Sequence, residues 1–460
     1  MYCVGRNIVK KKRSPELHEL FGHDCALAKN LSNAALFRIR QNFTARAKES
    51  YTDNEREVLA EIEATAEATG RARPKAVMSY TFLEKLMRVT ENPDYFAGLP
   101  MQTAQQMLRK EVQDFKSWLA SLRKYRKDPT GYTGRPKMPK YVKSEMSTVI
   151  YTNQDCVIYR EENRCFLKFP KTKSRLRIQP LPEDAVLREV KVKPHYGGFE
   201  VLYTYECSGS ANDSDLCFYA AVDLGVDNIA AIATNEGHSL LVKGGAVKAE
   251  NQWYNKQRSR LVSGLTKGHE TKVAPKSGRL DALSGKRKDF MLDTCHQISC
   301  RIVDFCLRHR VAVLYLGQNR FWKHNSGIGR KNNQTFVSIP FAMLRQMITY
   351  KAERAGICVM LQEESYTSQA SFLDGDYIPT YGRDDRKASF SGRRISRGLY
   401  RSADGTVINA DLNAAANILR KAKQDAFEGV SDSDFLKNPE VLYYTGLHDK
   451  RTPAEGIAAA

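Results

Sequence analysis

Five short apolar segments in the second half of the chain constrain its fold more than any other feature. Three of them are separated only by turns: FYAAV (218–222), IAAIA (229–233) and SLLVK (239–243). The other two, VAVLYL (311–316) and ICVMLQ (357–362), each follow a segment with helical periodicity. Strands joined by short turns pair antiparallel, whereas a strand that follows a helix usually lies parallel to its neighbour. We therefore expect one mixed sheet.

This order of elements, completed by a helix from about residue 411, is that of an RNase-H-like α/β domain within an α+β multidomain chain. The domain would include residues 217–364 and 411–430, and residues 365–410 would form an insert within it. Residues 207–216, CSGSANDSDL, have the composition of a linker. Residues 431–460 are left as a C-terminal tail.

The first half of the chain is expected to contain a helical part and a strand-rich part. Residues 25–125 have helical periodicity, most clearly in 99–127, where apolar residues recur every three or four positions. Residues 145–206 form short alternating segments separated by Pro, Gly, Asn and Asp, which indicates a small antiparallel barrel or sheet. The apolar face of the 99–127 helix consists of Ala104, Leu108, Val112, Phe115, Leu119 and Leu122.

Basic residues exceed acidic ones by a wide margin, with 72 Lys and Arg against 52 Asp and Glu and a formal net charge of +20. Such a surplus favours a polyanionic partner. Residues 123–143, RKYRKDPTGYTGRPKMPKYVK, combine cations for phosphates with rings that can stack on bases. A solvated linker is the alternative. The candidate nucleic-acid contacts in this segment are Arg123, Lys124, Arg126, Lys127, Tyr132, Arg135, Lys137 and Lys140.

Several classes of protein are excluded by what the sequence lacks. It has no apolar run of about 18 residues, so we expect no membrane span and no membrane partner. The N-terminal residues are basic but lack the apolar stretch of a signal peptide. The ten cysteines include no Cys-x-x-Cys pair, which fits reduced thiols in a cytoplasmic compartment.

Two aspartates stand where a metal-dependent nuclease requires carboxylates. Asp223 ends the apolar strand FYAAV, and Asp411 begins the Ala-rich helical stretch NADLNAAANILRKA. Hydrolysis of a phosphodiester with two metal ions needs several carboxylates around ions about 4 Å apart, and Mg²⁺ prefers oxygen ligands. The alternatives are an ordinary turn residue for Asp223 and a helix cap for Asp411.

A third carboxylate is missing from its usual place and is expected from a neighbouring strand. The fourth strand of an RNase-H-like domain usually ends in Glu, but here it ends at Gly317 and Gln318. The next strand ends with Glu363 and Glu364, and parallel strands point their C-terminal ends to the same edge. Because side chains alternate along a strand, only one of the two should face the gap at Gly317. We prefer Glu364, with Glu363 in reserve; the alternative is that both are loop acids and the nuclease is inactive.

The chain resembles the TnpB family, the insertion-sequence nucleases also described as OrfB-type transposases, which are related to Fanzor proteins and type V CRISPR effectors. The matching segments occur in one order and include most of residues 216–424. They are VDLGVDNIAAIATNEG, NQWYNKQRSRL, DTCHQISCRIVDF, FVSIPFAMLRQMITYKAERAGI, ESYTSQASF, FSGRRISRGLYRS and NADLNAAANILRKA. Two segments in the N-terminal half match less sharply, LPMQTAQQMLRKEVQDFKSWL and GRPKMPKY.

The resemblance implies an RNA-guided DNA endonuclease with a RuvC nuclease domain that holds two Mg²⁺ ions. It also implies a barrel-like wedge domain at residues 1–24 and 126–206, with a helical recognition domain at 25–125 inserted into it. The expected partners are a guide RNA derived from the element's transcript and a double-stranded DNA target. A short flanking motif would be read by the protein and the remainder by base pairing. The expected location is the bacterial cytoplasm, in association with the nucleoid.

The sequence departs from the common family pattern at two places. The glutamate at Gly317 is absent, and Glu364 stands three residues before Thr367, where some family members carry their glutamate. Many relatives bind zinc through two Cys-x-x-Cys pairs in the insert, but residues 365–410 contain no cysteine, so we expect no zinc. A basic patch in the insert would contact the target strand, with a solvated loop as the alternative. It consists of Arg393, Arg394, Arg397 and Arg401.

Two other functions stay open at this point. A nuclease-dead, RNA-guided DNA-binding repressor would keep the fold and the basic surfaces without a working metal site. A DNA transposase would bind the ends of the element without RNA and join strands. The sequence does not predict the oligomeric state.

Overall fold

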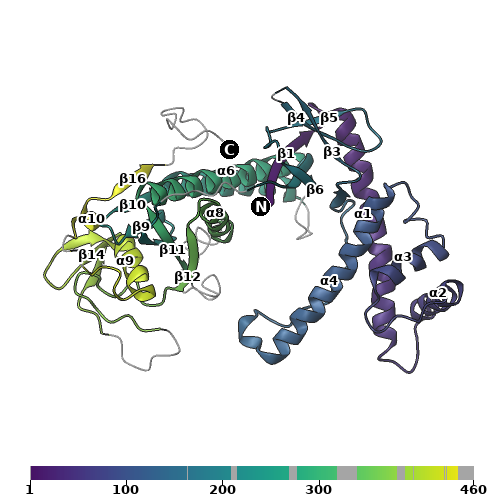
Figure 1. Cartoon of the computed structure of the whole chain (residues 1–460), viewed down its shortest axis with the longest axis horizontal. Helices are drawn as coiled ribbons and strands as arrows, with labels where there is room; N and C mark the ends of the chain where they lie inside the picture. Colours follow the sequence, from purple (N-terminus) through teal and green to yellow (C-terminus); the bar gives the residue numbers. More distant parts are fainter. Residues whose placement is uncertain are drawn as a thin grey trace. The chain divides into compact units, whose positions relative to one another are not determined.

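The computed structural model describes residues 2–162, 164–208, 215–268, 277–318, 339–380, 389–396, 398–428, 430 and 433–443. The chain divides into two compact units, Met1–Ser208 and Gly209–Ala459, drawn in Figure 1. We call them unit 1 and unit 2 and describe each by itself. Within the described ranges, no helix is both long and apolar enough to cross a membrane.

Unit 1 contains a group of helices packed around α1 and α4. Helix α1 begins at Pro15, earlier than the predicted residue 25, because proline is favoured at the first position of a helix. In α4 the predicted apolar face is buried, with Leu119 partly exposed at its edge. Thr103, Met107 and Glu111 widen that face. The helices are α1 (Pro15–Ala45), α2 (Asp53–Thr69), α3 (Tyr80–Val89) and α4 (Met101–Lys127), followed by a short 3-10 turn at Pro129–Gly131.

The strands of unit 1 form two antiparallel sheets. A four-stranded sheet has the order β1-β7-β6-β2, and a three-stranded sheet has the order β3-β4-β5. Asn7 Nδ2 in β1 donates a hydrogen bond to the Arg177 carbonyl in β5, 2.8 Å away. Closure into a barrel stays a prediction. The strands are β1 (Tyr2–Lys10), β2 (Val149–Thr152), β3 (Val157–Glu161), β4 (Arg164–Lys168), β5 (Arg175–Ile178), β6 (Val186–His195) and β7 (Gly198–Glu206).

Unit 2 is built on a six-stranded sheet with the order β12-β11-β8-β9-β10-β16. The strands β8, β9 and β10 are antiparallel, while β11 lies parallel to both β8 and β12, which confirms the predicted order of strands. Strand β16 extends the sheet from within the predicted C-terminal tail, where no strand was expected. The strands are β8 (Phe218–Asp223), β9 (Asn228–Thr234), β10 (Ser239–Lys243), β11 (Val311–Gln318), β12 (Cys358–Glu363) and β16 (Glu440–Tyr443).

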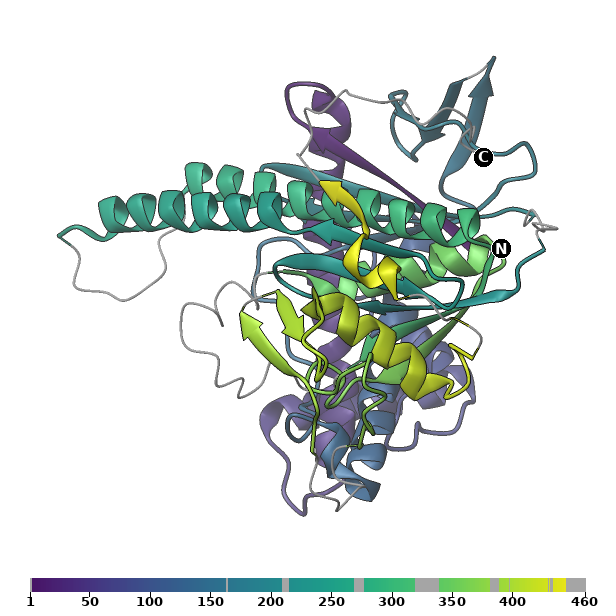
Figure 2. The same cartoon turned by 90° about the vertical axis from the view of Figure 1, so that its left-hand side faces the viewer.

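Helices cover both faces of this sheet. Ala220 and Val222 of β8 belong to the apolar cluster that α6 and α8 complete, whereas Ala221 packs against Ile418 and Leu419 of α9. This alternation along β8 explains why the strand is apolar throughout. Helices α5 and α6 run side by side and extend beyond the sheet (Figure 2). The helices are α5 (Gly245–Thr266), α6 (Gly278–Arg308), α8 (Phe341–Arg354), α9 (Ala410–Ala422) and α10 (Asp434–Lys437).

The insert between β12 and α9 contains a small antiparallel sheet, β13 (Arg393–Ser396), β14 (Leu399–Arg401) and β15 (Val407–Asn409). Tyr400 is buried and donates a hydrogen bond to the Gln369 carbonyl, 2.7 Å away. Asn413 and Asn417 of α9 donate to the Ala370 carbonyl at 2.8 and 2.7 Å. Buried side chains and hydrogen bonds therefore hold the described part of the insert against α9.

Candidate functional site

Asp223 is the last residue of β8, at the edge of the sheet where β11 and β12 also end. Burial is the main cause that raises the pKa of its carboxyl well above the ordinary value, and the charges of Glu364 and Asp411 raise it further. Arg394 and the backbone of Leu224 act in the opposite direction. The three predicted acids are therefore close enough to interact electrostatically.

Glu364 follows β12 and lies beside Gly317 of β11. A Cβ atom at position 317 would overlap Glu364 Oε2, and it would stand 3.0 Å from Ile418 Cδ1 and 3.3 Å from the Val222 carbonyl oxygen. The missing side chain at Gly317 thus provides the space that the Glu364 carboxylate occupies, next to the residue that precedes Asp223. Burial raises the pKa of Glu364 to about 7, against the opposing charge of Arg345.

Glu363 has different partners from its neighbour. Its Oε2 forms an ion pair with Lys421 Nζ at 2.6 Å, and its Oε1 accepts a hydrogen bond from the Ser365 backbone N–H at 2.7 Å. The Lys421 side chain is largely buried in this contact. The side chains of these two adjacent acids therefore have different environments: Glu363 is paired with α9, and Glu364 lies beside Gly317.

Asp411 is the second residue of α9, but a different residue caps that helix. Asn409 Oδ1 accepts hydrogen bonds from the backbone N–H groups of Asp411 and Leu412 at 3.0 and 3.2 Å. The Asp411 carboxylate instead accepts from Asn228 Nδ2 at 2.7 Å and pairs with Arg394 Nη2 at 3.2 Å. This geometry disfavours the alternative that Asp411 is merely a helix cap.

The sequence singled out neither Asn228 nor Arg345, although both contact this site. Asn228 is the first residue of β9 and orients Asp411. Arg345 of α8 donates to the Gly317 carbonyl at 3.2 Å, and its buried Nε has no hydrogen-bond partner among the described residues. An Asn in a turn and an Arg on a helix are too common to mark a site without the folded arrangement.

The donor set suits a hard divalent cation. Three carboxylates come from three elements, and the pKa of two of them is raised because burial and like charge disfavour the ionised form. A bound dication relieves both effects, since its charge favours the deprotonated acids. Oxygen ligands alone are what Mg²⁺ prefers.

The predicted basic patch of the insert lies next to Asp411. Arg393 and Arg401 are opposite each other in the β13–β14 ladder and both are exposed. Arg394 is exposed too, and it reaches the Asp411 carboxylate. Arg397 lies outside the described residues. A chain of phosphates that approached Asp411 would thus meet these arginines.

The basic segment of unit 1 is anchored along α1 and α4. Trp118 Nε1 donates to the Pro136 carbonyl at 3.2 Å, Arg40 donates to the Pro139 carbonyl at 3.2 Å, and Asn33 holds both backbone groups of Val142. The basic side chains point into solvent, which makes a free linker a poor description of this segment. The exposed cations are Arg123, Lys124, Arg126, Lys127, Arg135, Lys137 and Lys140, and Tyr132, which is half-buried, packs edge-to-face on Tyr125.

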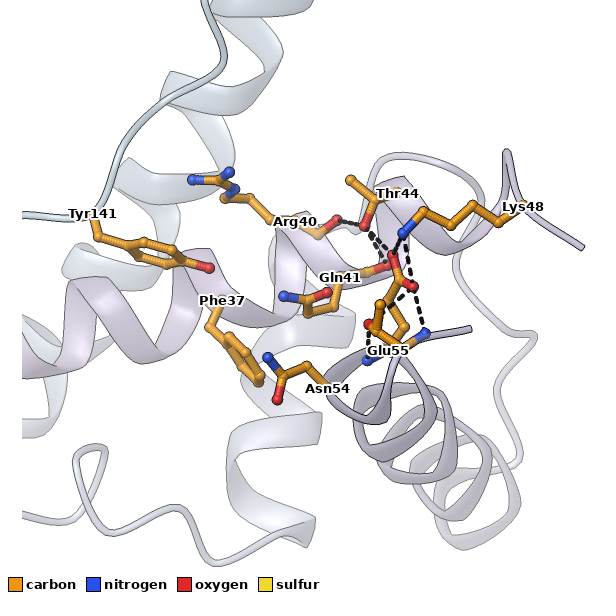
Figure 3. A pocket seen from close by; sticks show the side chains of 9 residues that line it. Phe37, Arg40, Gln41, Thr44, Lys48, Asn54, Glu55 and Tyr141 are labelled. Atoms are coloured by element: carbon orange, nitrogen blue, oxygen red, sulfur yellow. Dashed lines mark hydrogen bonds and ion pairs between the residues drawn. The ribbon is translucent and has the colours of Figure 1, made fainter. Parts of the chain in front are cut away.

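A cavity of about 470 Å³ opens in unit 1 between the last turns of α1, the start of α2 and Tyr141 (Figure 3). Its acid, Glu55, belongs to the capping box of α2 together with Thr52. A hydrogen bond from Lys48 is the main cause that lowers the pKa of Glu55 to about 2. The polar groups of this cavity therefore serve the start of a helix, and we assign it no catalytic role.

The sheet order of unit 2 is consistent with an RNase-H-like domain, and the three acids at one edge form a candidate metal site. Residues 205–322 match the OrfB_IS605 family, described as a probable transposase, and residues 341–418 match the Cas12f1-like TNB domain. With the relatives below, these matches support a relationship of the chain to the TnpB family and to type V effectors.

Three curated relatives are similar over part of their length. The CRISPR-associated endodeoxyribonuclease Cas12f2 of a Micrarchaeota archaeon (strain CG1_02_47_40) is 25% identical over 258 residues, 54% of this chain and 44% of the relative. Cas12f1 of Sulfoacidibacillus thermotolerans is 28% identical over 165 residues, 35% of this chain and 34% of the relative. The TnpB-like protein ORF457 of Acidianus two-tailed virus is 24% identical over 247 residues, 52% of this chain and 47% of the relative. The chain thus spans less than half the length of each.

A solved structure supports the fold. The cryo-EM structure of a Cas12f1–sgRNA–target DNA complex matches with a TM-score of 0.50 at 13% sequence identity. The match extends over 89% of this chain and 84% of the other. At this level of identity the similarity concerns the fold alone.

Proposed function

We propose that this chain is an RNA-guided DNA endonuclease in which Asp223, Glu364 and Asp411 hold two Mg²⁺ ions. The observation that carries the proposal is the position of Glu364 Oε2 in the space left by Gly317, beside the end of β8. That position gives the nuclease fold a third carboxylate at the edge where the first stands. Burial is the main cause of the raised pKa of Asp223, and the further rise from the charges of Glu364 and Asp411 is the expected consequence of such a cluster without metal.

The residues of the chain would prepare this site before any metal binds. Asn409 fixes the start of α9 and Asn228 orients the Asp411 carboxylate, while Arg345 offsets the charge of Glu364. Bound Mg²⁺ would supply Lewis-acid activation of water and of the leaving 3′ oxygen, so that 5′-phosphate ends are expected. Arg394 would exchange its contact with Asp411 for a target phosphate.

The nucleic-acid partners are proposed from charge and from relatives. One relative of known structure was solved with a guide RNA and target DNA. The exposed cations of residues 123–140 in unit 1 and the arginines of β13 and β14 would contact these strands through phosphates. Phosphate contacts position a strand without reading it, so base pairing with the guide would provide sequence specificity beyond a short flanking motif. The proposed division into wedge, recognition, nuclease and insert domains follows the predicted boundaries.

The test is plasmid cleavage by the full chain coexpressed with its guide RNA. Asp223→Ala and Glu364→Ala should reduce cleavage by at least about 1,000-fold, because each removes a metal ligand. Glu363→Ala is the matched control, since it removes an adjacent acid whose partner is Lys421, and it should keep measurable cleavage. Full activity of Glu364→Ala would refute the assignment.

The same assay separates the two rival functions. A repressor without nuclease activity would bind guide and target in a gel-shift measurement but leave the plasmid intact in Mg²⁺. The family description as a probable transposase favours the other rival. Strand joining by protein that copurifies with no discrete RNA would establish a transposase and exclude guided cleavage.

A further inference from the structure

Three side chains that could ligate a metal ion lie close together at the edge of the sheet where β8 begins, opposite the edge where β8 ends at Asp223. Glu236 and His238 lie in the turn between β9 and β10, and His309 is the residue that follows the last residue of α6. One ligand atom from each lies within 4.8 Å of the other two. Thr234, just before the turn, pairs with Ala220 near the start of β8, whereas Asp223 ends that strand. The cluster is therefore separate from the candidate nuclease site.

The distances within this cluster suit shared coordination better than hydrogen bonding. Glu236 Oε2 is 3.6 Å from His309 Nδ1 and 3.8 Å from His238 Nε2. Hydrogen bonds between such atoms measure about 2.7–3.2 Å. A tetrahedral zinc ion with bonds of about 2.0–2.2 Å holds its ligand atoms about 3.3–3.6 Å apart. Glu236 Oε2 thus lies from each imidazole nitrogen at nearly the distance that separates two ligand atoms of a tetrahedral zinc ion.

Rigid elements hold the three side chains in place. The turn is fixed by the Thr234 backbone N–H, which donates to the His238 carbonyl at 2.9 Å, and by Thr234 Oγ1, which accepts from the His238 N–H at 3.0 Å. His309 packs its ring on Phe305 of α6 with centroids 4.6 Å apart, and on His238 with centroids 4.1 Å apart. Little side-chain movement is then needed to bring three donors to one ion.

The charges around His309 act in both directions. His309 lies at the C-terminal end of the 31-residue helix α6, where the helix dipole is negative. The nearby Arg308 is already paired with Glu440, at 3.0 Å to both carboxylate oxygens. Burial, followed by the charges of His238 and Arg308, lowers the pKa of His309 against the opposing charges of Glu236 and Glu440, which favours the neutral imidazole that can bind a metal.

We propose that Glu236, His238 and His309 bind Zn²⁺, with water as the fourth ligand, and that the ion fixes the β9–β10 turn to the end of α6. Two imidazoles and one carboxylate suit zinc, whereas Mg²⁺ prefers oxygen ligands throughout. This proposal departs from the expectation of no zinc, which was argued from the missing cysteines of residues 365–410; the proposed site lies outside that segment and contains no cysteine. Zinc bound here is structural and does not depend on the nuclease proposal.

The test measures zinc on the full chain after chelator treatment. The protein is dialysed against micromolar Zn²⁺ with millimolar Mg²⁺ and a non-thiol reductant, and its metal content is determined by mass spectrometry. Millimolar Mg²⁺ competes for any site made of oxygen ligands alone, so about one zinc per chain should remain in wild type. His238→Ala, His309→Ala and Glu236→Gln should each lower zinc affinity at least tenfold. His23→Ala, which removes an exposed histidine of unit 1, should have no effect.

A second measurement keeps the proposal falsifiable if a variant does not fold. Co²⁺ in place of Zn²⁺ gives intense visible absorption when it is four-coordinate, weak absorption when it is six-coordinate, and a charge-transfer band when thiolates bind it. Wild type should show the four-coordinate spectrum without the thiolate band. Retention of zinc by the His238→Ala/His309→Ala double variant, a six-coordinate spectrum, or a thiolate band from the exposed cysteines would each overturn the site.

Discussion

The two edges of the sheet in unit 2 gather opposite kinds of titratable groups. At the edge where β8 and β12 end, burial raises the pKa of Asp223 and Glu364. At the other edge, burial lowers the pKa of His309. Both shifts favour the neutral side chain, but an acid becomes neutral by binding a proton and an imidazole by releasing one. The two proposed sites would thus suit a hard cation at the acidic edge and a softer cation at the histidine edge.

Among the substitutions that separate the two edges, Gly317→Ala should have the largest effect. It should lower plasmid cleavage, because it changes the acidic edge alone. The added Cβ would overlap Glu364 Oε2, so the carboxylate must move away from the end of β8. A displacement of about 1 Å at a catalytic group can cost about 100-fold in rate. We expect plasmid cleavage to fall by at least that factor, while zinc binding at the histidine edge is unchanged.

Gly264→Ala is the matched control for that substitution. Gly264 lies in α5 with nothing within 4 Å of an added Cβ, so the change should leave cleavage intact. A further variant, Gly317→Asp combined with Glu364→Ala, returns an acid to the fourth strand and should recover part of the lost activity. Wild-type cleavage by Gly317→Ala would show that Glu364 does not act from this space.

When metal is removed, the titratable groups at the two edges should also change the stability of the fold with pH in opposite directions. Glu364 has a folded pKa of about 7 against an unfolded value near 4.5, so the folded state binds more protons between these limits. Its contribution to stability is complete below about pH 4.5 and falls, by up to about 3 kcal/mol, as the pH rises to 7. Mg²⁺ should oppose this loss because it favours the ionised acid.

The contribution of His309 to stability has the opposite pH dependence from that of Glu364. Its folded pKa lies below the unfolded value of about 6.5, so its contribution is present above that pH and is lost as the pH falls. We would measure melting temperatures in the presence of a chelator. The melting temperature of Glu364→Gln should rise relative to that of wild type as the pH rises, and that of His309→Asn should rise relative to wild type as the pH falls. Parallel pH profiles for both variants would contradict the contrast between the edges.

The site residues at the acidic edge could be predicted from the sequence, whereas those at the histidine edge could not. Asp223 follows an apolar strand and Asp411 begins a helix, so local patterns mark both. Neighbouring parallel strands that end at one edge led to Glu363 and Glu364, side-chain alternation allowed only one of them to face Gly317, and the family resemblance favoured Glu364. His238 and His309 instead meet because α6 returns its C-terminus to the β9–β10 turn, and no periodicity encodes that meeting. The short strand β16 was missed for a similar reason, since its partner β10 lies far away in the sequence.

Asn409→Ala should have the smallest effect, and it tests whether Asp411 is available to a metal. Asn409 Oδ1 accepts from two N–H groups at the start of α9, so the loss of this cap should cost about 1 kcal/mol and lower the melting temperature by about 2–4 °C. Asn409→Ser keeps an acceptor and should lose less. Cleavage should fall by no more than about tenfold in either variant. An unchanged melting temperature for Asn409→Ala would mean that Asp411 can cap α9 itself, which would restore the structural interpretation of that acid.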